Sequence, residues 1–296
     1  MKSLVRPLWD LRSDDAKEVG GKALGLARLM DLGVEVPPGF VVTASFFLEV
    51  RSREPQEPEA EALSERIPQP LQQEIETALE TLGSSPAGYA VRSSAVEEDS
   101  RTASFAGIHE SYLEVGREEV LRHVFRCWAW AFSDRAAAYR ARVGLPTDPA
   151  AFRMGVVVQR MLRPSVSGVL FTRDPESGDE ALRIQAVEGL GDKLVQGSVT
   201  PASVRVPRPH GAASCHPEAP FPLDPPRLEE LVEVALRLEA AWGCPLDLEW
   251  AVDSERLHFL QARPITRLAR EDATLTGEGG EGDSHEDILW TRANLR

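Results

Sequence analysis

The second half of the chain consists mainly of short β-rich runs, and this pattern constrains the fold more than any other feature of the sequence. The runs, each bounded by turn residues, are MGVVVQRML, SGVLFTRD, LRIQAV, ASVRVP, LDLEWAVD and RLHFLQARP. Short strands separated by turns are typical of an antiparallel sheet. A single amphipathic helix, predicted over 226–242, interrupts them, with its apolar residues three or four positions apart. We therefore predict an antiparallel sheet with one helix packed on it.

The first half mixes helices with strands. Helical periodicity predicts helices over 22–32, 68–82 and 118–142, while β-branched runs predict strands over 41–43 and 89–93. A chain of 296 residues suits two lobes of this size. The sequence therefore predicts an α+β fold with an N-terminal lobe over 1–150 and a C-terminal lobe over 151–268.

The last part of the chain lacks periodicity. Residues 269–287 are acidic and rich in glycine, which is typical of a flexible linker. The segment 288–296 then begins with the apolar Ile-Leu-Trp triplet. We expect this segment to start a further domain that the chain itself does not contain.

Charge and cysteine content exclude several classes of protein. Lys and Arg number 33 against 47 Asp and Glu, and the net charge of −14 opposes non-specific binding to nucleic acid or an anionic membrane. Cys127, Cys215 and Cys244 are widely spaced, which excludes a zinc knuckle and indicates a reducing compartment. Neither a signal peptide nor a membrane span is recognisable, so we predict a soluble cytoplasmic protein.

Two glycines and a lysine, Gly20, Gly21 and Lys22, precede the first predicted helix. Glycines free the backbone to expose its N–H groups, and a helix start attracts anions. Lys22 would add a mobile ammonium group at the same place. The alternative is a glycine-rich helix entry with a surface lysine. The standard G-x-x-x-x-G-K-[ST] phosphate loop is absent.

Four further features of the sequence are candidates for parts of a ligand site. Arg92 lies near the C-terminal end of the predicted strand over 89–93, where a guanidinium can fork onto phosphate oxygens or form a salt bridge. The stretch from Ser104 to Gly107 suits a loop that closes over a ligand, or an ordinary turn. Gln159 interrupts an apolar run. It would either contact a base or be a buried amide that is bonded to the backbone. Glu188 adds a carboxylate beside a flexible loop.

The hairpin over 246–265 carries the most informative pattern. Alternation places Asp247 and Glu249 on one face of the first strand, while Gln261 and Arg263 share a face of the second. If Glu249 pairs opposite Gln261 or Phe259, the polar groups converge into a set that suits Mg²⁺. An odd register would instead turn Gln261 to the apolar side. The remaining alternative is a solvated face with a weak cross-strand ion pair.

Taken together, these segments resemble the ATP-binding domain shared by phosphoenolpyruvate synthase (pyruvate, water dikinase), pyruvate phosphate dikinase and rifampicin phosphotransferase. The motifs that carry the resemblance are GGKALGL, VPPGFVVT, VRSSAVEEDS, SFAGIHESYLEV, VVVQRM, SGVLFTRDP, EGLGDKLVQG, LDLEWA and LQARPI. They extend over residues 15 to 267. The resemblance implies an ATP-grasp fold with ATP held between the two lobes.

The resemblance also implies roles for individual residues. Lys22 and Arg92 would bind and neutralise phosphates, and Ser104 and Gly107 would cover them. Gln159 and Met161 would lie beside the adenine, and Glu188 would contribute to the nucleotide site.

Glu249 and Gln261 would hold Mg²⁺, and Arg263 would stabilise the charge that develops during transfer. Lys22, Arg92 and Arg263 are thus the predicted catalytic residues. These roles suit phosphoryl transfer, which depends mainly on positioning and electrostatics.

The family's reaction splits Mg-ATP into AMP and phosphate and leaves a phosphohistidine on a separate swivelling domain, which then phosphorylates pyruvate or another small acceptor. No glycine-rich Thr-Ser-His motif occurs in this sequence, so we expect the histidine domain in cis, outside this chain, or in trans. Departures at Ile108, Asp192 and Ala202 bear on substrate subtype. A pyruvate, water dikinase is the leading hypothesis. A rifampicin-type antibiotic phosphotransferase and a non-catalytic ATP-binding regulatory module are the alternatives.

Overall fold

A computed structural model describes the chain over residues 3–53, 67–95, 111–131, 138, 141–142, 153–191, 194, 199–208, 214–215 and 220–265. The chain forms two compact units. The first comprises Met1–Asp31 and Val36–Leu162, and the second comprises Leu32–Glu35 and Arg163–Arg296. Each unit combines an antiparallel sheet with helices, so the predicted α+β class is confirmed. The predicted linker over 269–287 and the segment 288–296 lie outside the described residues.

The first unit contains a five-stranded sheet in the order β1-β2-β5-β3-β4. Its strands are β1 (Val5–Pro7), β2 (Gly39–Val42), β3 (Tyr89–Ala95), β4 (Ser111–Val115) and β5 (Met154–Arg160). We expected the run over 154–162 to belong to the second lobe, and this assignment is wrong. β5 pairs with both β2 and β3 at the centre of the first sheet. The first unit therefore ends at Leu162 instead of near residue 150.

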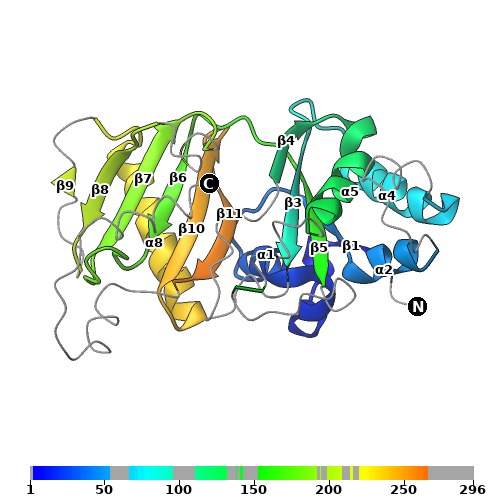
Figure 1. Cartoon of the computed structure of the whole chain (residues 1–296). Coiled ribbons are helices and arrows are strands. Elements are labelled where there is room, and N and C mark those ends of the chain that lie inside the picture. Colours follow the sequence, from blue (N-terminus) through cyan, green and yellow to red (C-terminus); the bar gives the residue numbers. More distant parts are fainter. Residues whose placement is uncertain are drawn as a thin grey trace. The chain divides into compact units, whose positions relative to one another are not determined.

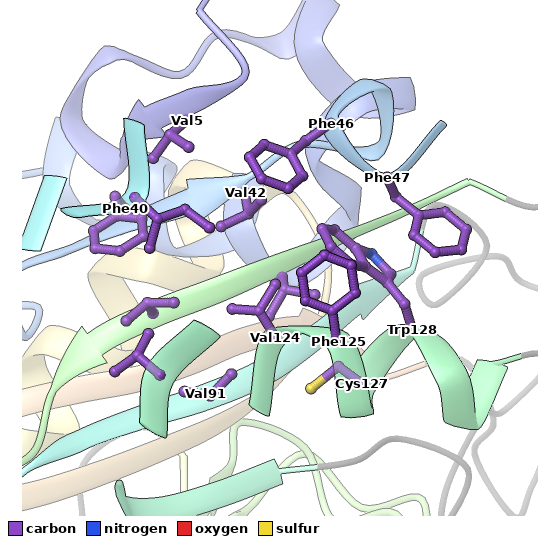
Figure 2. Close-up of a cluster of buried hydrophobic side chains, with 14 of the residues drawn as sticks. Val5, Phe40, Val42, Phe46, Phe47, Val91, Val124, Phe125, Cys127 and Trp128 are labelled. Atoms are coloured by element: carbon purple, nitrogen blue, oxygen red, sulfur yellow. The ribbon is translucent and has the colours of Figure 1, made fainter. Parts of the chain in front are cut away.

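Helices cover both faces of this sheet. They are α1 (Ala16–Asp31), α2 (Ala44–Arg53), α4 (Gln69–Leu82) and α5 (Val120–Ala131), with short 3₁₀ turns at Leu8–Asp10, Ser13–Asp15 and Arg117–Glu119. Side chains of α2, α4 and α5 share one apolar core with the sheet. Figure 2 shows Phe46 and Phe47 of α2 beside Trp128 of α5. The centroids of the Phe47 and Trp128 rings are 4.9 Å apart. The indole N–H of Trp128 donates to the Met154 carbonyl at 3.0 Å. Helix α1 packs against β3 and β5.

Helix α2 was not predicted, because the apolar residues after Thr43 looked like the continuation of a strand. The Thr43 hydroxyl accepts from the Phe46 N–H at 3.4 Å, which is the bond of a helix N-cap. Phe46, Phe47 and Val50 are buried at helical spacing. A cap and a helical stripe thus override the β-like composition of this segment.

The second unit contains a six-stranded sheet in the order β11-β10-β6-β7-β8-β9. Its strands are β6 (Val166–Phe171), β7 (Leu182–Glu188), β8 (Ala202–Val206), β9 (Ser214–Cys215), β10 (Leu246–Asp253) and β11 (Arg256–Pro264). Helix α8 (Pro225–Trp242) lies against one face of this sheet (Figure 1). The Asp224 side chain caps α8, and Gly243 ends it in the left-handed conformation, so the predicted helix over 226–242 is confirmed.

Glu35, in the connection between α1 and β2, bonds to the edge strand β11. The Phe259 N–H donates to the Glu35 carbonyl at 2.9 Å, which satisfies one of the open positions of the sheet edge. Among the described residues, no helix is both long and apolar enough to cross a membrane.

Candidate functional site

The Gly20-Gly21-Lys22 segment lies inside α1, at a break between two helical stretches. Gly20 has φ 78° and ψ 170°, a conformation that L side chains rarely adopt. A Cβ added to Gly20 would lie 2.0 Å from the Ser94 carbonyl oxygen on β3. Glycine is therefore required here both by its backbone conformation and by the close approach of α1 to β3.

Lys22 is not a surface lysine, which was the alternative interpretation of this segment. The residue is buried, and its ammonium group donates to the Ser93 carbonyl at 2.8 Å. The next backbone N–H, that of Ala23, donates to the Ser94 hydroxyl at 3.1 Å. The segment is thus fastened to the end of β3, and the Ala23 N–H is already engaged by the protein.

Arg92 and Gln159 lie on the same face of the first sheet. Arg92 pairs with Val157 on β5. Ala90, two residues before Arg92, pairs with Gln159, two residues after Val157. Residues two apart on a strand, and residues directly opposite on a neighbouring strand, point to the same face. This is the face covered by α1, because Ser94, which bonds to α1, is again two residues from Arg92.

Gln159 and Met161 were predicted to lie beside an adenine. Gln159 is buried, and its amide nitrogen donates to the Pro37 carbonyl at 2.9 Å, so the amide is bonded to backbone. Met161 is half-buried, and its N–H donates to the Gly88 carbonyl at 3.0 Å. Gln159 lies near the end of β5, and Met161 directly follows its last residue. Ser104 and Gly107 lie outside the described residues.

In the second unit, the hairpin of β10 and β11 has the register that a metal site requires. Glu249 lies opposite Gln261, and Asp247 lies opposite Arg263. A β-bulge follows, because Trp250 pairs with Phe259 and one residue of β11 is left over. These four polar residues, Asp247, Glu249, Gln261 and Arg263, form what we call the hairpin cluster.

Arg263 is held within the hairpin cluster by Asp247. Its Nε and Nη2 atoms both donate to Asp247 Oδ2, at 2.9 and 2.7 Å. Burial raises the pKa of the Asp247 carboxyl, the Arg263 charge opposes this rise, and the Glu249 charge adds to it. Asp247 holds the guanidinium in one direction. The Arg263 side chain would therefore lose less conformational freedom if it bound a ligand.

An apolar patch lies beside the hairpin cluster on the same face. Asp247 and Glu249 pair with Phe171 and Val169 of β6, which belong to a buried apolar group together with Leu194. Glu188 does not join this face. It is exposed and lies opposite Val166, a position that alternation assigns to the other side of the sheet.

The donor set at Glu249 and Gln261 fits Mg²⁺. A carboxylate and an amide oxygen are hard ligands, and Mg²⁺ commonly takes one or two protein ligands while keeping waters and substrate phosphates. Side chains directly opposite on antiparallel strands have Cβ atoms about 5 Å apart, close enough to share one ion. No group of three or more His, Cys, Asp or Glu suited to a metal occurs in the described part of the chain.

Sequence reasoning missed the part played by Ser93 and Ser94. It assigned Ser94 to a loop, whereas β3 continues to Ala95 and both serines are fully buried. Their partners lie 71 positions away in the sequence. The only available signal was the pair of small polar residues directly after an apolar strand.

Comparison with known proteins gives a family and several relatives. The family model described as "Pyruvate phosphate dikinase, AMP/ATP-binding domain" matches residues 53–219 and 216–278. A rifampicin phosphotransferase of Streptomyces sp is 37% identical over 316 residues, covering 90% of this chain and 36% of the relative. The prodigiosin synthesizing transferase PigC of Serratia marcescens is 34% identical over 319 residues, covering 95% and 35%.

A probable phosphoenolpyruvate synthase of Methanothermobacter thermautotrophicus is 32% identical over 312 residues, covering 88% of this chain and 45% of the relative. The chain thus spans between about a third and under half of the length of these relatives. These matches confirm the resemblance that the motifs indicated.

Proposed function

Because the chain belongs to the family of the pyruvate phosphate dikinase AMP/ATP-binding domain, we propose that it catalyses the ATP half-reaction of a histidine-dependent phosphotransferase. In this reaction Mg-ATP and water yield AMP and inorganic phosphate, and one phosphoryl group passes to a histidine of a separate domain. The observation that carries the proposal is the register of the hairpin, which pairs Glu249 with Gln261 and Asp247 with Arg263.

The second unit would supply the metal site and one cation. Glu249 and Gln261 would hold Mg²⁺, which neutralises phosphate oxygens when bound. Arg263, directed by Asp247, would stabilise the negative charge that develops on the transferred group. The buried apolar group of Val169, Phe171 and Leu194 borders this cluster.

The first unit would supply two further cations. Lys22 and Arg92 are proposed to bind phosphate oxygens, and their support is that both are positioned by β3, one through Ser93 and the other as a member of the strand. The backbone bond of Gln159 favours a role in shaping the end of β5 over a direct base contact. The ATP-grasp architecture, and the binding of one nucleotide by both units, stay predictions from the resemblance.

Two acceptors are candidates for the second half-reaction. The motifs favoured pyruvate, as in a pyruvate, water dikinase. The 37% identity to a rifampicin phosphotransferase supports an antibiotic as the second candidate. Both candidates use the same ATP half-reaction, so the proposal for this chain does not depend on the choice.

The test combines the chain, Mg-ATP and a histidine domain from a relative, with AMP measured by chromatography and phosphohistidine by mass spectrometry. We expect both products to form in equal amounts. ATP binding without AMP would overturn the proposal and favour the regulatory module.

Arg263→Ala should abolish transfer and retain most of the ATP binding. Arg227→Ala is the matched control, since it removes an arginine that forms ion pairs on the surface helix α8. Transfer that survives Arg263→Ala would contradict the role of Arg263.

A further inference from the structure

We propose that Ser94 is a positioning residue, which holds Lys22 in the geometry needed to bind a nucleotide phosphate. The inference rests on the proposed function, because it assumes that Lys22 contacts the phosphates. Ser94 itself touches no substrate in this proposal. It acts through the segment of α1 that carries Lys22.

Three contacts join residues 20–23 of α1 to residues 93–94 of β3. Gly20 approaches so closely that a Cβ would overlap the Ser94 carbonyl oxygen. The Lys22 ammonium group donates to the Ser93 carbonyl at 2.8 Å, and the Ala23 N–H donates to the Ser94 hydroxyl at 3.1 Å. Both of these hydrogen bonds are buried.

The break at Gly20 explains why the hydroxyl is needed. The first N–H groups of a helical stretch have no carbonyl of their own helix to bond, and a buried N–H without an acceptor is unfavourable. Because Gly20 departs from helical φ and ψ, the N–H groups just after it depend on partners from outside the helix. For Ala23 that partner is Ser94 Oγ.

The same contact sets the position of Lys22 relative to Arg92. Arg92, Ser93 and Ser94 are consecutive residues of one strand, and β3 pairs regularly with β5 along all of them. Fastening residues 22 and 23 to this stretch fixes the lysine to the strand that carries the arginine. Two cations that bind neighbouring phosphates must keep a set separation, and small errors of position strongly weaken such sites.

The test is a double-mutant cycle on the whole chain, with the Kd for Mg-ATP measured by isothermal titration calorimetry and the melting temperature measured in parallel. Lys22→Met removes the charge and keeps the length of the side chain, and should weaken binding by roughly 10- to 100-fold. Ser94→Ala should weaken binding by roughly tenfold, whereas Ser94→Thr keeps the hydroxyl and should stay within about twofold of the native chain.

The combined variant decides the question. If Ser94 acts through Lys22, Ser94→Ala should change Kd by less than about twofold once Lys22→Met is present. Undiminished loss in that background would overturn the inference, and so would unchanged affinity in Ser94→Ala. If Lys22→Met alone leaves Kd unchanged, the proposed function of Lys22 fails instead. Ser94→Cys, which keeps the shape of the side chain but supplies a much weaker acceptor, replaces Ser94→Ala in the cycle if the latter does not fold.

Discussion

Removing the Asp247 carboxylate should destabilise the second unit by about 3 kcal/mol. The side chains of Asp247 and Arg263 are only 11% and 23% exposed, and two hydrogen bonds converge on Oδ2. Breaking a fully buried pair costs about 3–5 kcal/mol because the remaining charge is left without its partner. Since the guanidinium of Arg263 keeps some contact with water, the lower end of that range applies to Asp247→Ala.

The pKa of Asp247 identifies the source of this loss. Burial raises that pKa in spite of Arg263, so the attraction between the two groups is largely offset by the desolvation of the carboxylate. The destabilisation in Asp247→Ala therefore comes mainly from the Arg263 charge, which loses this carboxylate. It follows that Asp247→Ala combined with Arg263→Met should be more stable than Asp247→Ala alone.

The matched control for Asp247→Ala is Asp179→Ala. Asp179 and Arg205 also lie in the second unit with an N–O distance of 2.7 Å, but their side chains are 40% and 49% exposed. An exposed pair contributes about 0–1 kcal/mol. Urea denaturation gives both free energies of unfolding, and hydrogen exchange of peptides from 246–264 locates the effect. Equal losses in the two variants would refute the reasoning that burial sets the magnitude.

Two further predictions concern backbone strain and pH. Gly20→Ala should cost about 3 kcal/mol or more, because it combines a positive φ with a clash against Ser94. Gly83 has a similar backbone conformation, with φ 81° and ψ 175°, but nothing lies within 4 Å of its Cβ, so Gly83→Ala should cost only the backbone strain of about 1–3 kcal/mol. Similar melting temperatures for the two variants would contradict the clash. Burial lowers the pKa of His258 from 6.5, so its contribution to stability is present above about pH 6.5 and is lost as pH falls through the folded pKa. The urea midpoint of the native chain should therefore drop between about pH 7.5 and pH 5 by more than that of His258→Gln, and parallel profiles would exclude this histidine as the cause.

Helices whose ends carry local signals were predictable from the sequence. The helix predicted over 68–82 is α4 at Gln69–Leu82, and the helix predicted over 226–242 is α8 at Pro225–Trp242. Both begin with prolines, which a helix tolerates only in its first turn, and both end at a glycine with positive φ. These signals lie within a few residues of each boundary.

Membership of a sheet was less predictable, because it depends on partners far away in the chain. The run that forms β5 resembles the other β-rich runs of the second half, yet it pairs with β2 and β3 of the first unit. Nothing within the run itself distinguishes these partners from β6. Composition therefore predicted the strand but not the sheet it joins.

The same difference between local pairings and contacts with distant residues applies to the candidate site. The pairing of Glu249 with Gln261 was a stated possibility, since both lie on one hairpin and alternation limits the registers. The fastening of Lys22 to Ser93 was not foreseen, because it joins residues 71 positions apart through a backbone carbonyl. Every residue has a backbone carbonyl, so the identity of residue 93 does not reveal this hydrogen bond.

The β-bulge in β11 shows how a single residue decides the chemistry of the hairpin. In a regular strand Phe259 and Gln261 would share a face, so one of them would be on the wrong side of the sheet. A misplaced Gln261 would bury an amide without partners, at about 1–3 kcal/mol, and exposing Phe259 would forfeit about 1.5–3 kcal/mol of burial.

Absorbing one residue in a bulge gives up about one ladder hydrogen bond, worth about 1 kcal/mol. The bulge is therefore the less costly solution, and it lets Phe259 be buried at 1% exposure while Gln261 faces Glu249. Two alternating patterns of opposite phase on one strand thus predict a bulge between them. In this chain the pattern of apolar residues up to Phe259 and the polar pair Gln261 and Arg263 already contain that prediction.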